Sequence, residues 1–482
     1  MPIATQQQRV LQLQVYIVQS IDFSSLNLNS ALVDNLSTLG YQHMTAIQAQ
    51  SLPAIINNKD VIAQAKTGSG KTAAFALGLL NKLDVKRFRV QSLILCPTRE
   101  LADQVAKEIR KLARTIHNIK VLTLCGGTPM GPQIGSLEHG AHIIVGTPGR
   151  IEDHLRKQRL NLDNLTTLVL DEADRMLEMG FQEALDLIFS LAPKQRQTLL
   201  FSATFPPQIE KLAEKFMLAP IKVTAQESHD NNTINQHFYQ VENNSERLLA
   251  SKLLLQQYQP QSCVIFCNTK VECQDVADQL NQAGYSALAL HGDLEQKDRD
   301  QTLVRFANKS IAILVATDVA ARGLDIDNLD AVINYHIAHD PEVHVHRIGR
   351  TGRAGATGVA LSLISHKEAH KVIRLEEYLG QEIISETLPS GEVLTSNIMQ
   401  PNMVTLQIDG GKKQKLRPTD ILGALTAKTS AKETIQGAQV GKIQLFSTRA
   451  YVAVDSKIAK VALKKIAEGK MKGRNFRVRK LS

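Results

Sequence analysis

The sequence predicts two consecutive α/β domains, each built on a doubly wound parallel sheet, followed by a small α+β domain. Short β-branched apolar runs alternate with longer stretches of helical spacing, a pattern typical of βαβ units with helices on both faces of the sheet. A polar segment without any period interrupts this pattern near the middle of the chain, and the pattern then resumes. Over residues 403–482 the pattern changes again, and the charge changes with it.

The first α/β domain is expected over residues 21–224, and residues 1–20 are expected to form an N-terminal extension because they fit no domain. Stretches with helical spacing, such as 100–113 and 181–191, separate the apolar runs. The runs expected to be buried strands are Val61–Ala65, Leu93–Cys96, His142–Val145, Thr167–Leu170 and Thr198–Phe201.

The polar segment Thr224–Gln236 predicts a linker because it has neither strand nor helix periodicity. The second α/β domain is then expected over residues 235–385. Its expected strands are Cys263–Cys267, Ala287–Leu290, Ile311–Ala316, Ala331–Asn334 and Val359–Ile364.

The last domain, over residues 403–482, is predicted to have the order β-α-β-β-α-β, which is that of a ferredoxin-like split unit. Its expected strands are Val404–Asp409, Lys442–Phe446, Ala450–Asp455 and Asn475–Lys480. Its expected helices are Pro418–Leu425 and Lys457–Glu468.

The composition excludes several classes of protein. Hydrophobic residues make up 43% of the 482 residues and charged residues 21%, which excludes a disordered or fibrous chain. No apolar run approaches the ~18 residues of a membrane span, and the first twenty residues lack the pattern of a signal peptide, so a cytoplasmic protein without a membrane partner is expected. The five cysteines form no C-x-x-C pair, which favours reduced thiols over a metal site at Cys263, Cys267 and Cys273.

The net charge of +9 is unevenly distributed along the chain. Residues 401–482 contain 18 Lys and Arg against 5 Asp and Glu, a net of +13, which leaves −4 for residues 1–400. Such asymmetry favours a near-neutral body that carries a module for binding a polyanion, nucleic acid being the leading candidate. A merely solvated basic tail is the alternative.

A glycine-rich turn joins the first predicted strand to a helical stretch at 73–82. In this arrangement backbone N–H groups wrap phosphates at a helix N-terminus. Lys71 would reach the β- and γ-phosphates of a nucleotide, and the Thr72 hydroxyl would bind Mg²⁺. The usual motif starts with Gly, where this chain has Ala65. The residues expected to cradle the nucleotide are Ala65, Lys66, Thr67, Gly68, Ser69, Gly70, Lys71 and Thr72.

A pair of carboxylates follows the fourth predicted strand. Asp171 and Glu172 would lie at the carboxyl end of that strand, the edge at which open parallel sheets bind ligands. One carboxylate can hold Mg²⁺ while its neighbour positions and deprotonates an attacking water. The sequence therefore predicts Asp171 as the metal ligand and Glu172 as the base. For Asp174 alone, a solvated acidic turn at the start of a helix is a plausible alternative.

Residues 171–174 spell DEAD, and the chain resembles the DEAD-box RNA helicases, whose motifs follow in order across residues 23–353. The resemblance implies two RecA-like domains, ATP and Mg²⁺ as cofactors, and ATP hydrolysis coupled to the separation of RNA strands. It assigns the coupling of these two activities to Ser202, Thr204 and His346.

The same resemblance assigns arginine fingers to the second domain. Residues 346–353 match the family's arginine-finger motif, and the fingers are Arg350 and Arg353. A guanidinium delivered from a separate domain would neutralise γ-phosphate charge in the transition state.

Residues 40–48 are similar to the family's Q motif, with Phe23 at the expected distance upstream. Gln48 offers both a donor and an acceptor to the edge of adenine, and Tyr41 can stack on the base. The usual prolines of this motif are replaced by other residues. Asp325 matches the family's contact to the ribose.

Several short motifs resemble the set with which the family grips the RNA backbone. They supply Arg charge, Thr hydroxyls or exposed Gly N–H groups, which bind phosphates. No base-reading aromatic stands out among them, which favours sequence-independent binding, with the 2′-hydroxyl distinguishing RNA from DNA. The expected RNA contacts are Arg99, Gly126, Gly127, Thr147, Arg150, Gln296, Arg299 and Thr317.

Residues 403–482 resemble the RNA-recognition-motif-like tail of the DbpA group of bacterial DEAD-box proteins. The resemblance implies docking on a hairpin of large-subunit ribosomal RNA and a role on an immature 50S particle. Tyr451 is the only obvious aromatic on the predicted sheet, which disfavours the usual stacking of bases there. The expected contacts are instead basic groups: Lys412, Lys413, Lys415, Arg417, Lys470, Lys472, Arg474, Arg477 and Arg479.

The sequence thus predicts a monomeric ATP-dependent RNA helicase with ribosomal RNA and the large-subunit precursor particle as partners. Two alternatives stay open. One is an ATP-gated RNA clamp or scaffold with little unwinding, which the intact Lys71, Asp171 and Glu172 disfavour. The other is a DNA helicase on the same core, which the Q motif and the DEAD spelling disfavour.

Overall fold

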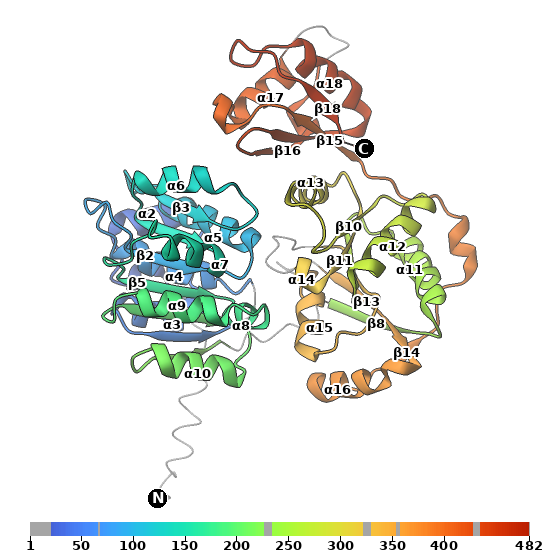
Figure 1. Ribbon diagram of the computed structural model, residues 1–482. Coiled ribbons are helices and arrows are strands. Elements are labelled where there is room, and N and C mark those ends of the chain that lie inside the picture. Colours follow the sequence, from blue (N-terminus) through green and yellow to red (C-terminus); the bar gives the residue numbers. More distant parts are fainter. Residues whose placement is uncertain are drawn as a thin grey trace, which may run out of the picture. The chain divides into compact units, whose positions relative to one another are not determined.

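The computed structural model describes residues 21–65, 68–225, 234–321, 329–352, 357–427 and 434–481. The chain divides into two compact units (Figure 1). The first unit contains a seven-stranded sheet, and the second contains another seven-stranded sheet and a four-stranded one. The N-terminal extension expected over residues 1–20 lies outside the described residues.

The sheet of the first unit is parallel throughout and has the order β3-β4-β2-β5-β6-β1-β7. The five predicted runs form its five interior strands. The two strands that the sequence pattern missed, β3 and β7, lie at the edges, where partial exposure removes the need for a continuous apolar run. The strands are β1 Val61–Gln64, β2 Ser92–Leu95, β3 Val121–Leu124, β4 Ile143–Gly146, β5 Thr167–Asp171, β6 Gln197–Ser202 and β7 Ile221–Thr224.

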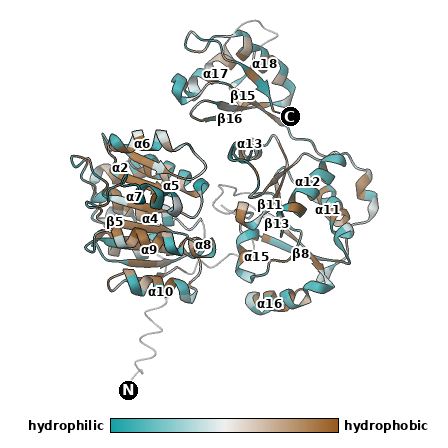
Figure 2. Cartoon of the chain, viewed as in Figure 1, coloured by the Kyte–Doolittle hydropathy of each residue, from teal (hydrophilic) through white to brown (hydrophobic). Residues whose placement is uncertain are grey.

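Helices cover both faces of this sheet, as a doubly wound fold requires. Successive residues of β2 point to opposite faces: Ile94 packs with α2 to α5, whereas Leu93 and Leu95 pack with α7 to α10. Figure 2 shows the hydrophobic strands lying between the helices. The helices are α2 Ser30–Thr38, α3 Ala46–Ile56, α4 Lys71–Asn81, α5 Arg99–Leu112, α6 Met130–Glu138, α7 Pro148–Arg156, α8 Ala173–Glu178, α9 Gln182–Leu191 and α10 Pro207–Phe216.

The large sheet of the second unit is also parallel, with the order β10-β11-β9-β12-β13-β8-β14. The five predicted runs are again strands. Two further strands were not predicted: β8 is half-polar and begins inside the segment expected to be a linker, and β14 consists of two exposed polar residues. The strands are β8 Ile234–Val241, β9 Cys263–Cys267, β10 Ala287–Leu290, β11 Ile313–Thr317, β12 Ala331–Asn334, β13 Gly358–Ser365 and β14 Ser385–Glu386.

Six α-helices accompany this sheet among the described residues, and a 3-10 helix, η4 (Gly391–Thr395), follows β14. The segment after β14 packs back onto the sheet's core through Leu388 and Ile398. The helices are α11 Asn244–Tyr258, α12 Lys270–Gln282, α13 Gln296–Ala307, α14 Asp318–Ala321, α15 Pro341–Ile348 and α16 Ala369–Leu379.

The four-stranded sheet is antiparallel, with the order β16-β17-β15-β18. Its first strand lies between the third and the fourth, which confirms the predicted ferredoxin-like topology. Helices α17 (Pro418–Thr426) and α18 (Ala459–Glu468) contribute to its single hydrophobic core. The strands are β15 Met403–Ile408, β16 Val440–Leu445, β17 Ala450–Asp455 and β18 Val478–Lys480.

The five cysteines are buried, and none forms a disulfide. The described residues hold no group of three or more His, Cys, Asp or Glu side chains suited to a metal ion. Among the described helices, none has both the length and the hydropathy needed to cross a bilayer.

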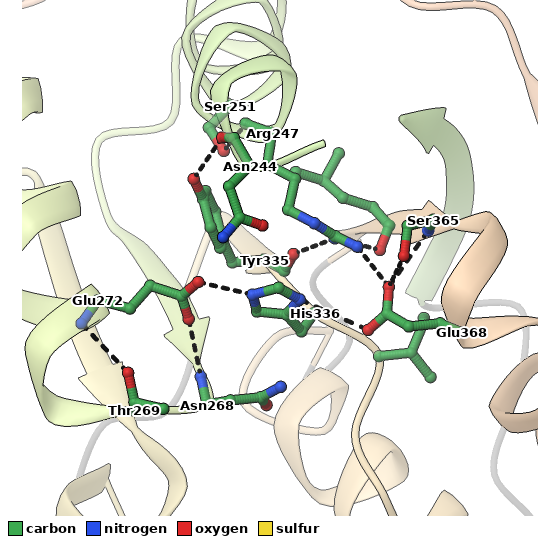
Figure 3. Close-up of polar contacts among 12 residues, drawn as sticks. Asn244, Arg247, Ser251, Asn268, Thr269, Glu272, Tyr335, His336, Ser365 and Glu368 are labelled. Atoms are coloured by element: carbon green, nitrogen blue, oxygen red, sulfur yellow. Dashed lines mark hydrogen bonds and ion pairs between the residues drawn. The ribbon is translucent and has the colours of Figure 1, made fainter. Parts of the chain in front are cut away.

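A buried network of charges fastens the end of β12 (Figure 3). Arg247 of α11 pairs with Glu368, and His336 bonds through Nε2 to Glu272 at 2.7 Å and approaches Glu368 through Nδ1 at 3.5 Å. Burial would lower the pKa of His336, but these two carboxylates hold it above its ordinary value. Burial would likewise raise the pKa of Glu368, and its bonds to His336 and Arg247 hold it well below the usual range.

Candidate active site

Three neighbouring strands bring the predicted nucleotide residues to one edge of the first sheet. β5, β6 and β1 lie side by side and run in parallel. The glycine-rich turn therefore follows β1 at the same edge where β5 ends in Asp171 and β6 ends in Ser202. This is the edge at which open parallel sheets bind ligands.

The glycine-rich turn adopts a conformation that glycine allows. Gly68 and Gly70 have φ angles of 88° and 94°, and α4 begins directly after Gly70. Ser69 is buried and Thr72 lies in the first turn of α4. Lys66 and Thr67, also expected to cradle the nucleotide, lie outside the described residues.

Lys71 and Asp171 are both buried at this edge, and the charge of Lys71 acts on the Asp171 carboxyl. Lys71 is 6% exposed, and its Nζ donates a hydrogen bond to the Ala65 carbonyl at 2.7 Å. Burial raises the pKa of Asp171 to about 7, although the charge of Lys71 opposes this shift, and Glu172 adds to it. A carboxylate whose ionisation is this costly fits a site that a divalent cation completes.

Glu172 is held in a conformation that is unfavourable for its residue type. It lies between β5 and α8, with φ of 54° and 9% exposure. A left-handed conformation costs a residue other than glycine about 1–2 kcal/mol. The surrounding structure therefore fixes the backbone of the predicted base.

Asp174, treated from the sequence as a surface turn, is instead a buried connecting residue. It is 2% exposed, and its Oδ2 accepts hydrogen bonds from the backbone N–H of Thr204 at 3.0 Å and from the Thr204 hydroxyl at 2.9 Å. Its backbone N–H donates to the Ser202 hydroxyl at 3.4 Å. The interpretation as a solvated turn was wrong, and the structure joins the predicted carboxylate motif to the predicted coupling residues Ser202 and Thr204.

The predicted Q motif braces the glycine-rich turn. Gln48 is 2% exposed; its Nε2 donates to the Gly70 carbonyl at 3.1 Å and its Oε1 accepts from the Thr45 N–H at 2.9 Å. The Thr45 hydroxyl donates to the Ser69 carbonyl at 2.7 Å. Thr45 was not singled out from the sequence, although its position three residues before Gln48 is that of a capping box.

Tyr41 and Phe23 meet edge to face, with ring centroids 6.5 Å apart. The Tyr41 hydroxyl donates to Glu108 at 2.6 Å, and the Lys111 ammonium lies 5.1 Å from the ring centroid. Burial and the bond to Glu108 raise the pKa of Tyr41. The ring is thus held against α5.

The predicted RNA contacts of the first unit come from turns after β2, β3 and β4. Arg99 starts α5, whose N-terminus is capped by the Thr98 hydroxyl. The Gly126 N–H lies 3.5 Å from the Thr147 hydroxyl, and Arg150 donates to the Thr128 carbonyl at 3.2 Å. Gly127 has a φ of 68°. Since β2, β4 and β3 are neighbours, these residues share the carboxyl edge with the nucleotide residues.

In the second unit the residues also gather at the carboxyl edge. Thr317 ends β11, Gln296 and Arg299 lie in the first turn of α13, and Arg299 donates to the Ala320 carbonyl of α14 at 2.8 Å. His346 and Arg350 lie in and just after α15. Arg353 and Asp325 lie outside the described residues.

Arg347, which sequence reasoning passed over, fastens α15 to the end of two strands. It is 2% exposed and binds Asp318 through two hydrogen bonds of 2.6 and 2.7 Å. It also donates to the carbonyl of His336 at 2.8 Å. These bonds join α15, the helix that precedes Arg350, to the residue that follows Thr317.

Three families match consecutive parts of the chain. Residues 45–212 match the DEAD/DEAH box helicase family, residues 245–355 match the helicase conserved C-terminal domain, and residues 405–480 match the DbpA RNA binding domain.

Similar proteins support the same grouping. The ATP-dependent RNA helicase DbpA of Escherichia coli (strain K12) is 52% identical over 460 residues, which are 95% of this chain and 99% of that relative. The DEAD-box ATP-dependent RNA helicase CshA of Bacillus subtilis (strain 168) is 43% identical over 74% of this chain and 72% of the relative. The solved structure of S. cerevisiae Dbp5 bound to RNA and ADP BeF3 matches with a TM-score of 0.69 and 30% identity, over 78% of this chain and 98% of that chain.

The raised pKa of Asp171 predicts a stability that depends on pH. In the folded protein this pKa is about 7, above the 3.8 of the unfolded chain, so stability falls as the pH rises between these values. Replacing Asp171 by Asn should therefore raise the free energy of unfolding by about 1–3 kcal/mol at pH 8 and change it little at pH 4. Urea unfolding of the nucleotide-free, Mg²⁺-free protein at both pH values measures this, with the exposed Asp163→Asn as control. An equal gain at both pH values would contradict the assignment.

Proposed function

The chain belongs to the DEAD-box ATP-dependent RNA helicases of the DbpA group, and we propose that it opens short RNA duplexes in precursors of the large ribosomal subunit. The observation that carries this proposal is the joining of two parts. The described residues of the predicted ATP site in the first unit gather at one sheet edge, and a basic domain that matches the DbpA RNA binding domain lies near the end of the chain. We further propose that the protein works as a monomer in the cytoplasm.

The residues at the edge of the first sheet fit binding of ATP. The N–H groups of the turn from Gly68 to Lys71 would hold the phosphates at the start of α4, where the helix dipole favours negative charge. Lys71 would exchange its bond to the Ala65 carbonyl for the β- and γ-phosphates. Gln48, already seated on the Gly70 carbonyl, would read the adenine edge.

Mg²⁺ would be held by the Thr72 hydroxyl and by Asp171, whose pKa is raised by burial. When bound, the ion supplies neutralisation of charge on the phosphates. Glu172, fixed by its backbone at the mouth of the site, would orient and deprotonate water. Arg350 and Arg353 would stabilise the charge that develops on the γ-phosphate.

The coupling of hydrolysis to strand separation would run through the bonded set Asp174, Ser202 and Thr204, with His346 from the second domain. The proposed RNA grip consists of the turn residues of both sheets, which bind phosphates and sugars and so position RNA without reading its sequence. Target choice would then rest on the C-terminal domain.

The positions of two basic loops support these loops as the RNA-binding part of the C-terminal domain. The Lys472 ammonium donates to the Lys415 carbonyl at 2.7 Å, which brings the two predicted basic segments together. Lys412, Lys413 and Arg474 are exposed in these two loops. A cluster of exposed basic side chains is suited to a folded RNA backbone.

Replacing Glu172 by Gln should abolish rapid turnover while leaving binding intact, because the amide keeps the shape and loses the base. We expect RNA-stimulated ATPase to fall by at least about 100-fold, with ATP and RNA affinities within about threefold of the parent. The exposed Glu183→Gln is the matched control. Near-normal ATPase in the Glu172 variant would exclude this residue as base. Tight ATP-dependent RNA binding by the parent protein with little duplex separation would favour the RNA clamp.

The RNA-binding role of the C-terminal loops is tested by comparing two variants that each lose three positive charges. The variant with Lys412, Lys413 and Arg474 replaced by Gln should weaken binding to ribosomal RNA by about tenfold or more and reduce its salt dependence by about 2 in the logarithmic slope. The matched variant neutralises the exposed Lys457, Lys460 and Lys464 around α18.

ATPase stimulation by ribosomal RNA and by an unrelated structured RNA measures both effects. Equal losses in the two triple variants would mean that bulk charge, and not the loops, holds the RNA. Equal stimulation by both RNAs would remove the ribosomal target and leave the helicase.

A further inference from the structure

The centre of the outer face of the C-terminal sheet is buried, although the domain's described α-helices, α17 and α18, pack on the other face. Alternate residues of β15 and β17, such as Leu406 and Val452, point into the core with α17 and α18. Their neighbours point the other way and would be exposed if nothing covered them. These outward residues and their exposures are Thr405 0%, Gln407 0%, Tyr451 3% and Ala453 1%.

The cover over Tyr451 and Thr405 comes from α13 of the second α/β domain and the residues just after it, which lie in the same compact unit. Val304 of α13 packs with Tyr451 and Leu481 in an apolar cluster that is separate from the domain's own core, and Phe446 joins it. Phe446 meets Tyr451 edge to face at 5.4 Å between ring centroids. The Tyr451 ring is thus covered by side chains of the protein.

Polar contacts complete this interface. Asn308, just after α13, donates through Nδ2 to the Thr405 hydroxyl at 3.1 Å, and the Ser310 hydroxyl lies 2.7 Å from the same oxygen. Thr405 is fully buried, so its hydroxyl would lose these partners and be rehydrated if the domain moved away.

The contacting residues of α13 lie on a single helical stripe. Asp300, Val304 and Asn308 are spaced by four, and the charge of Asp300 acts on Tyr451. One turn earlier on the same stripe is Gln296, whose side-chain amide donates to Asp300 at 2.7 Å. Gln296 is a proposed RNA contact. The stripe of residues that contacts the C-terminal sheet is therefore continuous with a proposed RNA-binding position.

The connection to this domain is short. Gln256 donates to the Ser396 carbonyl at 2.7 Å and Gln400 donates to the Gly284 carbonyl at 3.0 Å, which fixes the connecting segment to the second α/β domain. β15 begins at Met403. So short a tether gives the docking contact a high effective concentration, and a small interface suffices.

We propose that the outer face of the C-terminal sheet is a docking surface for α13 of the same chain, and that the docked arrangement is the working one. It holds the exposed basic loops in a fixed place relative to Gln296 and Arg299, so that RNA captured by the loops is presented to the second α/β domain. The last step rests on the proposed RNA binding by the loops, whereas the docking does not.

A disulfide tests the docking directly in the full-length protein. Because the Ser310 and Thr405 hydroxyls are 2.7 Å apart, the variant with both replaced by Cys should form an intramolecular disulfide under mild oxidation. The native cysteines are all buried and give little background. The control joins Ser310→Cys to Thr419→Cys, an exposed position at the start of α17, in the helical layer.

We expect the first pair to close at least about tenfold faster than the control, and the cross-linked enzyme to keep RNA-stimulated ATPase within about twofold. Equal rates for the two pairs would overturn the docking. Loss of activity on cross-linking, restored by a reductant, would overturn the claim that the docked state is the working one.

A charge placed in the interface gives a second readout. Val304→Glu should raise the RNA concentration for half-maximal ATPase by about fivefold or more and leave the maximal rate unchanged. Val271→Glu makes the same change at a position of α12 that is 64% exposed and should do nothing. An unchanged RNA requirement in the Val304 variant would overturn the presentation of RNA.

If the loop variant binds RNA normally while the disulfide forms fast, the proposed RNA-binding role of the loops fails and the docking stands.

Discussion

All strands in each of the two large sheets run in one direction, and the rest of the structure depends on that constraint. Parallel strands need crossover helices, which bury both faces of the sheet and leave its edges as the only places where polar side chains can be exposed. The turns that carry Lys71, Asp171 and Thr204 follow neighbouring strands and meet at the carboxyl edge. The chemistry is therefore local to loops, while the core remains apolar.

Buried charge at that edge is tolerated because each group is braced by another. Lys71 is bonded to the turn it follows, Gln48 to the same turn from α3, and Asp174 to Thr204 across two strands. The bond between Asp174 and Thr204 is the described contact that joins the carboxylate motif of β5 to the turn after β6, and we assign to it the transmission of hydrolysis to strand separation.

The interior strands were predictable because burial on both faces forces a run of apolar residues. Strands β3, β7, β8 and β14 were missed since partial exposure lets them keep polar residues. In the site, the glycine-rich turn and the carboxylate pair have local signatures. The partners of Asp174 and Arg347 have no such signature, because residues that bond across different strands have no fixed spacing in the sequence. The burial of Tyr451 under α13 is likewise a tertiary fact, and the sequence indicated only that one aromatic was too few for base stacking.

The most direct measurement compares ATP hydrolysis and duplex separation in the Thr204→Val variant, which keeps the side chain's shape and removes the hydroxyl that donates to Asp174. The control, Thr166→Val, removes a hydroxyl bond at the opposite end of β5. We expect unwinding to fall by about tenfold or more while RNA-stimulated ATPase stays within about threefold of the parent, since the nucleotide residues are unchanged. Parallel loss of both activities, or full retention of unwinding, would contradict coupling through this bond.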